Sequence, residues 1–124
     1  MLLYRQISPG KMKVDGPGKS NFLPENDREL STRREAITAK GAHDAYISEG
    51  GQSLGTWGVT VREVHNTGLA AYDDEHLNDG PPFHVTILFP DNLTRGKRER
   101  IAQTLREYAK HRGNNGWLYG PIES

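Results

Sequence analysis

The sequence predicts an α+β fold in which a small, mainly antiparallel sheet carries two packed helices. Apolar and polar side chains alternate over residues 55–63 and again over residues 83–89, which is typical of strands with one buried face. Residues 95–112 instead repeat their apolar side chains with the period of an amphipathic helix. Because strands and helices follow one another in mixed order, we expect both helices on one face of the sheet.

The composition is that of a small globular protein. The chain has 124 residues, enough for the single domain that we expect over residues 1–124, and its formal net charge is zero. It contains no cysteine, which excludes disulfides and thiolate metal sites. No apolar run approaches the roughly 20 residues of a membrane-spanning helix, and the N-terminus lacks the apolar region of a signal peptide. We therefore expect a soluble, cytoplasmic protein without a membrane partner.

The first half of the chain predicts two strands, a loop and a helix. They are a strand over residues 2–7, a long polar loop over about 8–28, a short strand over 29–34 and a helix between Thr38 and Gly50. Thr38 is a suitable N-cap for that helix, and Gly50 is a usual C-terminal stop. The loop is rich in glycine, proline and charged residues, and connections of this length often bind ligands or partners.

The stretch over residues 55–63 is the clearest strand, and we expect it at the centre of the sheet. Trp57, Val59 and Val61 share one of its faces. Their β-branched and aromatic side chains suit a half-buried pleated surface. Glu63 then lies at the end of the predicted strand. Catalytic groups often lie at strand ends, but residues there are also usually exposed to solvent.

The second half adds further strands and the longest helix. They are a helical turn over residues 62–66, short strands over 69–72 and 117–119, a strand over 83–89 and a helix over about 95–112. The strand over 83–89 directs His84 and Thr86 away from its apolar face. The predicted core consists of Trp57, Val59, Val61, Phe83, Val85, Ile87, Phe89, Ile101, Leu105 and Tyr108.

A series of short motifs resembles a family of small bacterial proteins for which no activity is established. In chain order they are Tyr4-Arg5-Gln6, Leu30-Ser31, Gly58-Val59-Thr60-Val61 with Glu63, Gly68-Leu69, a strand from His84 to Phe89, and Trp117-Leu118-Tyr119-Gly120-Pro121. The resemblance spans nearly the whole chain. It implies a shared general organisation of the chain but no catalytic mechanism. The chain departs from the family pattern at Ser8-Pro9, where His-Pro is common, and in the inserted residues 113–116.

His84 and Thr86 form the first candidate site. Two residues apart on a strand, they point the same way, and a histidine and a hydroxyl at this spacing can hold one phosphate. The spacing is similar to the His-x-Thr motif of two-histidine phosphoesterases. Those enzymes need a second copy to supply both a base and an acid, and His65-Asn66-Thr67 is the candidate for it. An ordinary polar sheet face would carry the same residues.

Arg5, then Ser53 or Thr60, then Glu63 follow the order Arg, Ser/Thr, Glu, which loosely resembles ADP-ribosyltransferase-like domains. The resemblance implies that Arg5 would bind the phosphates of NAD and that Glu63 would stabilise an oxocarbenium ion. The plainer interpretation is that both are solvated or ion-paired surface residues. If the protein is an enzyme, its catalytic candidates are therefore His84, Arg5 and Glu63.

Charge is segregated along the chain. The predicted last helix is rich in Lys and Arg, and Arg98, Arg106 and Lys110 are its candidates for binding nucleic-acid phosphates. No aromatic residues interleave with them, so we expect such binding to be weak. An acidic loop does not match the spacing of a calcium-binding loop, and neither a metal site nor a cofactor is predicted. Its acidic and histidine residues are Asp73, Asp74, Glu75, His76 and Asp79.

The function that we expect first is binding of a protein partner, as an accessory component of a larger assembly. The absence of a strong catalytic motif, the polar loop over about 8–28 and the segregated charge favour it. Two alternatives stay open: a small enzyme that acts on NAD or a phosphodiester, and nucleic-acid binding through the last helix. An enzyme of this kind requires Arg5 and His84 to line one cleft.

Overall fold

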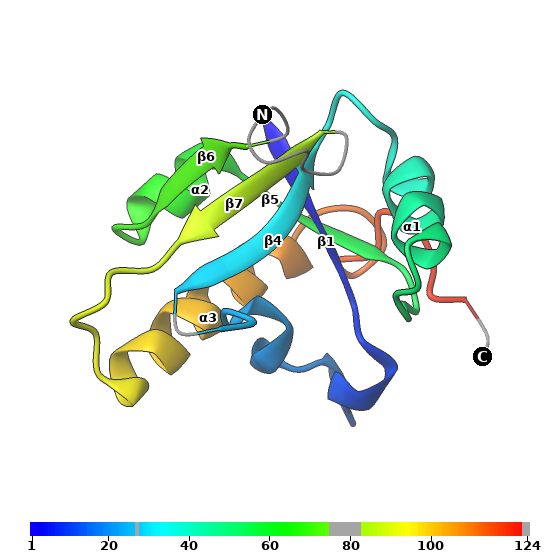
Figure 1. The fold of residues 1–124 in the computed structure, drawn as a ribbon. Helices are drawn as coiled ribbons and strands as arrows, with labels where there is room; N and C mark the ends of the chain where they lie inside the picture. The colour runs from blue at the N-terminus through cyan, green and yellow to red at the C-terminus, as the bar shows by residue number, and fades with distance from the viewer. Residues whose placement is uncertain (27, 75–82, 123–124) are drawn as a thin grey trace.

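The computed structural model describes residues 1–26, 28–74 and 83–122, which form the α+β fold that the sequence predicts. A five-stranded sheet has the order β5-β1-β4-β7-β6, and its neighbouring strands are antiparallel (Figure 1). The strands are β1 (Leu2–Gln6), β4 (Glu29–Arg34), β5 (Thr56–Thr60), β6 (Ala70–Asp73) and β7 (His84–Leu88). The helices are α1 (Ala39–Ser48), α2 (Val61–Asn66) and α3 (Arg95–Lys110).

One face of the sheet packs on α3 to form the hydrophobic core. Residues three or four positions apart share a helix face, so Ala102, Leu105 and Ala109 of α3 are buried together. The buried apolar residues of the core are Leu3, Ile7, Phe22, Leu30, Trp57, Val59, Val64, Leu69, Val85, Ile87, Phe89, Ala102, Leu105 and Ala109. Most of the predicted core is confirmed, although Val61, Ile101 and Tyr108 are only partly buried against it.

The helix α1 packs on the opposite face of the sheet, so the expectation that both long helices share one face is wrong. Successive strand residues point to opposite faces, and Gln6 therefore faces away from Leu3 and the core. On that side Gln6 Nε2 donates to Thr56 Oγ1 (3.0 Å), which donates to the Ala39 carbonyl at the start of α1 (3.0 Å). Because these contacts are polar, the spacing of the apolar residues in α1 did not show on which face of the sheet the helix packs.

The strand β5 lies at an edge of the sheet, whereas the sequence predicted it at the centre. It also ends early because a capping box starts α2: Thr60 Oγ1 accepts from the Glu63 amide (3.1 Å), and Glu63 Oε1 accepts from the Thr60 amide (2.8 Å). The C-terminal segment covers the outer edge, where an isolated bridge between Thr56 and Tyr119 replaces the strand expected over 117–119. The middle of the sheet is β4, the least distinct strand in the sequence.

The predicted loop over about 8–28 is a folded segment packed beside α3. Its elements are η1 (Pro9–Lys11), β2 (Met12–Lys13), β3 (Gly16–Pro17) and η2 (Lys19–Phe22). Phe22 is fully buried in the core. The buried Asn21 side chain accepts from the Ser8 amide (2.9 Å) and donates to the Lys11 carbonyl (3.2 Å). These bonds fix the position of Lys11 relative to the sheet.

The strand β7 begins one residue later than the sequence predicts. Phe83 has a φ of +62°, a left-handed conformation that is uncommon outside glycine. Its ring centroid lies 5.0 Å from the guanidinium carbon of Arg34 instead of packing into the core. Phe83 is therefore a predicted core residue that contacts a cation at the end of the sheet.

Candidate functional site

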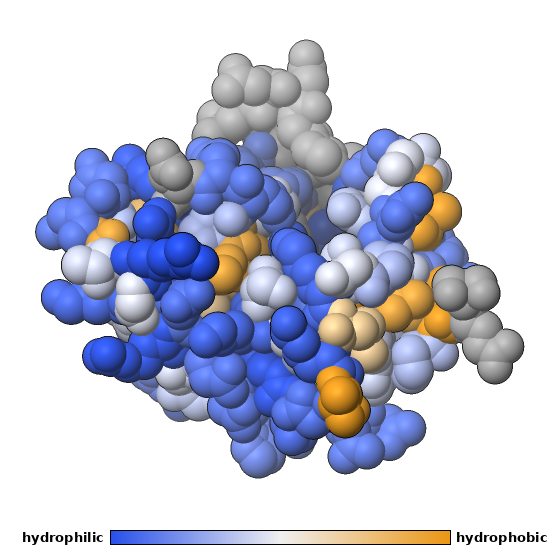
Figure 2. All heavy atoms as spheres, turned by 90° about the horizontal axis from the view of Figure 1, so that it is seen from below, coloured by the Kyte–Doolittle hydropathy of each residue, from blue (hydrophilic) through white to orange (hydrophobic). Residues whose placement is uncertain are grey.

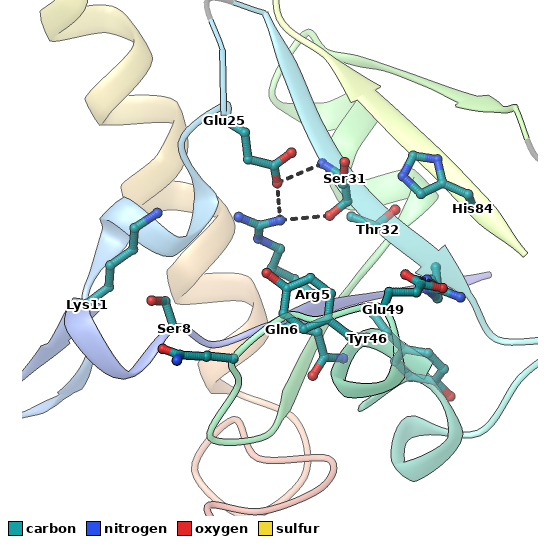
Figure 3. Close-up of a pocket in the computed structure, with 13 residues that line it drawn as sticks. Arg5, Gln6, Ser8, Lys11, Glu25, Ser31, Thr32, Tyr46, Glu49 and His84 are labelled. Atoms are coloured by element: carbon teal, nitrogen blue, oxygen red, sulfur yellow. Dashed lines mark hydrogen bonds and ion pairs between the residues drawn. The ribbon is translucent and has the colours of Figure 1, made fainter. Parts of the chain in front are cut away.

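A cavity of about 450 Å³ lies between β1, β4, β7, α1 and the folded segment that follows β1 (Figure 3). All of its lining residues carry a polar or charged group. Arg5 and His84 both line it, so the structure brings together the two residues that the sequence predicted for a shared cleft. Small-molecule sites in proteins commonly have volumes of about 300–1,000 Å³, so the cavity is large enough for one small ligand.

Arg5 fills a gap between β1 and β4, which pair at one end and then diverge (Figure 1). Its Nη1 donates to the Ser31 carbonyl (3.0 Å) and to Glu25, and its Nε donates to the Asn21 carbonyl (2.7 Å) (Figure 3). Glu25 also accepts from the Ser31 amide (3.3 Å). Burial alone would raise the pKa of Glu25, but the Arg5 charge and these hydrogen bonds lower it overall. The ion pair thus satisfies a peptide group of β4 that β1 does not reach.

The Lys11 amine faces the Arg5 guanidinium at one end of the cavity. Figure 3 shows the remaining nitrogen of Arg5, Nη2, directed toward Lys11, and within the described residues Nη2 makes no hydrogen bond. Lys11 Nζ makes one long contact, 3.4 Å from the Ser20 carbonyl. Burial lowers the pKa of Lys11, the positive charge of Arg5 lowers it further, and Glu25 partly opposes both. The fold therefore holds two cations close together beside the cavity.

His84 is oriented by Asp74, which the sequence analysis considered only as part of the acidic loop and not as a partner of His84. His84 Nδ1 lies 2.6 Å from Asp74 Oδ1, and Thr86 Oγ1 donates to Asp74 Oδ2 (2.6 Å). Burial alone would raise the pKa of Asp74, but these bonds from Thr86 and His84 lower it overall. An ionised carboxylate only accepts, so Nδ1 donates to Asp74 and Nε2 is the ring nitrogen that is left for a ligand. Within the described chain Nε2 has no hydrogen-bond partner, and the ring projects toward the cavity (Figure 3).

The C-terminal end of α1 forms the wall opposite the folded segment. Arg33 of β4 is buried, and its Nη2 donates to both carboxylate oxygens of Glu49, with Oε2 at 2.6 Å. This ion pair ties the end of α1 to the sheet. Tyr46 and Gln52 add an aromatic ring and an amide to the same wall.

The second histidine of the phosphoesterase hypothesis does not reach this cavity. His65 is exposed on α2, and it is not among the residues that line the cavity. Thr86 also does not line it, because its hydroxyl is directed to Asp74. Among the histidines that the structure describes, only His84 lines the candidate site.

Glu63 also lies away from Arg5 and His84. Besides capping α2, its carboxylate accepts two hydrogen bonds from Arg112, at 2.8 and 2.9 Å. Burial alone would raise the pKa of Glu63, but the hydrogen bonds from Arg112 and Thr60 lower it overall. The order of residues that resembles an ADP-ribosyltransferase is therefore not assembled in space, and Glu63 stabilises the contact between α2 and the end of α3.

Of the cations proposed to bind nucleic acid, Arg106 is not exposed for that role. Its Nε donates to the Pro17 carbonyl (2.7 Å) and its Nη1 to Glu107 Oε1 (2.9 Å), so it holds β3 against α3. Arg106 was predicted on the solvent-exposed face of the helix, but it is buried because the folded segment covers it. Arg98 and Lys110 are half-buried, and neither lines the cavity.

The described ranges, residues 1–26, 28–74 and 83–122, contain neither a metal-binding cluster nor a membrane-spanning helix. No group of three or more His, Asp or Glu residues in them could hold a metal ion. Glu75, His76 and Asp79 of the predicted acidic loop lie outside these ranges. No helix within the ranges is long and apolar enough to cross a membrane.

The chain was compared with known protein families, curated proteins and solved structures, and none of the three comparisons found a match. The resemblance to a bacterial family therefore stays a prediction.

Proposed function

We propose that the cavity binds a small phosphate-bearing ligand and that His84 acts on it as a general acid–base, which would make the protein a small enzyme of phosphate-ester chemistry. The observation that carries this proposal is the placement of Arg5 and Lys11 at one end of a cavity that His84 also lines. This placement favours the enzymatic alternative over the binding of a protein partner, which the sequence first indicated.

The two cations favour an anion. Arg5 and Lys11 repel each other, and Glu25 compensates only part of their charge because it is directed to Arg5 Nη1 and the Ser31 amide. An anion between Arg5 Nη2 and Lys11 Nζ removes the repulsion and supplies acceptors to both groups. A phosphate has more acceptor oxygens than a carboxylate and can also bind Ser8, which lines the same cavity.

The orientation of His84 favours acid–base catalysis. Asp74 holds Nδ1, so the ring presents Nε2 as a base, as a catalytic histidine requires. In hydrolysis of a phosphodiester, the oxygen of water would bond to phosphorus while its proton passes to Nε2. The P–O bond to the departing alcohol would break, that oxygen would take up a proton from solvent water, and His84 would later return its own proton to solvent. Arg5 and Lys11 would stabilise the charge on the remaining phosphate oxygens.

Replacing His84 tests this role. We expect His84→Gln to remove hydrolysis of bis(4-nitrophenyl) phosphate while inorganic phosphate still binds, because Arg5 and Lys11 are unchanged. Asp74→Asn should lower the rate as well, since an amide no longer selects the correct tautomer. His65→Gln is the matched control, because His65 is an exposed histidine outside the cavity. Unchanged turnover in His84→Gln, or no phosphate binding by the wild-type protein, would contradict the proposal.

The protein partner stays a prediction from the sequence. The large apolar side chains that are exposed in the described ranges are spread over several elements, including Val14 between β2 and β3, Ile47 on α1 and Tyr72 on β6. Figure 2 shows one face of the molecule as mainly hydrophilic, with hydrophobic residues scattered over it. No observation on this face favours a particular partner.

A further inference from the structure

Tyr46 is the aromatic residue of the α1 wall, and its ring packs closely on the backbone. The Tyr46 ring lies against the backbone of Gly51: a Cβ atom at Gly51 would be 2.3 Å from Cε2 and 2.5 Å from Cδ2 of the ring. Gly51 is not in the left-handed region, unlike Gly50 with a φ of +93°. A side chain at position 51 would therefore have to displace the Tyr46 ring, although the backbone conformation there would accept one.

The ring contacts the backbone without being buried. Tyr46 is 38 % exposed although it lines the cavity, and Figure 3 shows its ring reaching over the middle of it. The exposure distinguishes Tyr46 from the buried aromatic residues of the core. The close contact with Gly51 distinguishes it from an aromatic side chain that extends freely into solvent. Tyr46, like Tyr4, thus brings an aromatic ring to a cavity whose other lining residues are polar or charged.

We infer that the ligand is a nucleotide, with its base stacked on Tyr46 and its phosphate between Arg5 and Lys11. This inference rests on the phosphate binding proposed above and adds the class of ligand. Every nucleobase has a flat π face that stacks on aromatic side chains, and such stacking contributes strongly to affinity. A phosphate without a base would leave the ring unused.

A second polar group is available for the edge of the base. Gln52 lines the cavity next to Tyr46, and its side-chain amide makes no hydrogen bond within the described residues. Its amide can donate to and accept from a base edge. The amide of Gln6 is occupied, because Nε2 donates to Thr56 and Oε1 accepts from Ser53 (2.7 Å). The cavity volume of about 450 Å³ fits a single nucleotide better than a polynucleotide.

The experiment compares ligands that share a phosphate and differ in the base. Dissociation constants of inorganic phosphate, ribose 5-phosphate and adenosine 5′-monophosphate are measured by calorimetry at constant ionic strength. We expect the adenosine nucleotide to bind about tenfold or more tightly than ribose 5-phosphate. Tyr46→Ala should remove this difference, and Tyr46→Phe should keep it because the ring remains.

Two further variants separate stacking from a general change in the helix. Gly51→Ala should also remove the preference for the nucleotide, since its Cβ displaces the Tyr46 ring. Ile47→Ala is the matched control, because Ile47 is an exposed neighbour on α1 that does not line the cavity. If both phosphates bind equally to the wild-type protein, or if Tyr46→Ala weakens them equally, the nucleotide inference is wrong and phosphate binding stands. If no phosphate binds, the proposed function itself is wrong.

Discussion

Replacing Arg5 by glutamine is expected to abolish phosphate binding and to destabilise the fold. The guanidinium occupies the gap between β1 and β4, where it binds Glu25 and the carbonyls of Asn21 and Ser31. A buried acceptor that loses its donor costs about 1–3 kcal/mol, so we expect a loss of about 2 kcal/mol or more in the free energy of unfolding. Chemical denaturation and phosphate titration measure the two effects.

Two variants separate the charge of Arg5 from its shape. Arg5→Lys keeps the positive charge but cannot form the planar fork, so it should bind phosphate weakly while losing most of the same stability. Arg62→Gln removes an exposed cation on α2 and should change stability by about 0.5 kcal/mol at most. An Arg5→Gln protein with wild-type stability and phosphate affinity would show that Arg5 neither fills the gap nor binds the ligand.

Leu105→Ala is expected to lower the free energy of unfolding by about 2–5 kcal/mol. Leu105 is fully buried on the face of α3 that packs against the sheet, and its truncation removes apolar contacts and leaves a cavity. Chemical denaturation measures the change, and Gln103→Ala on the exposed side of the same helix is the control. A loss below about 0.5 kcal/mol for Leu105→Ala would mean that the buried face of α3 is misidentified.

The fold was predictable where one pattern dominated a segment. In β7 and α3 the apolar side chains face a single layer, so their periods of two and 3.6 residues are clear. In β4 the core-facing residue after Leu30 is Thr32, whose hydroxyl donates to the Val85 carbonyl (2.7 Å), and Arg33 is buried on the other face, where its charge is satisfied by Glu49 from α1. Such a partner is distant in the sequence, and the centre of the sheet was therefore assigned to β5 instead.

The early end of β5 could have been found from local sequence. Thr60 and Glu63 have the spacing of a capping box, which starts a helix at the next residue. The alternation of Trp57, Val59 and Val61 extends past Thr60, and the sequence analysis therefore assigned these residues to a strand and overlooked the capping box. Capping and strand periodicity competed over the same residues, and the capping box, with two hydrogen bonds to otherwise unpaired amides, determined the structure.

The candidate site was only partly predictable. Arg5 and His84 were identified because few other residue types bind phosphate or exchange a proton near neutral pH. Asp74 reaches His84 through the register of β6 and β7, which pairs Asp73 with Val85 and which no tight turn in the sequence specifies. Lys11 depends on the fold of residues 8–28, which Asn21 organises through long-range hydrogen bonds.

The most direct test of the central claim is a titration of the wild-type protein with phosphate, followed by NMR of amide and arginine side-chain groups. Potassium chloride at the same ionic strength controls for nonspecific charge effects. If a phosphate binds between Arg5 and Lys11, the Arg5 Nε–H signal and the amide signals of Ser8, Lys11 and Ser31 should shift together and saturate. Shifts that are confined to the basic side of α3, or that never saturate, would contradict the account.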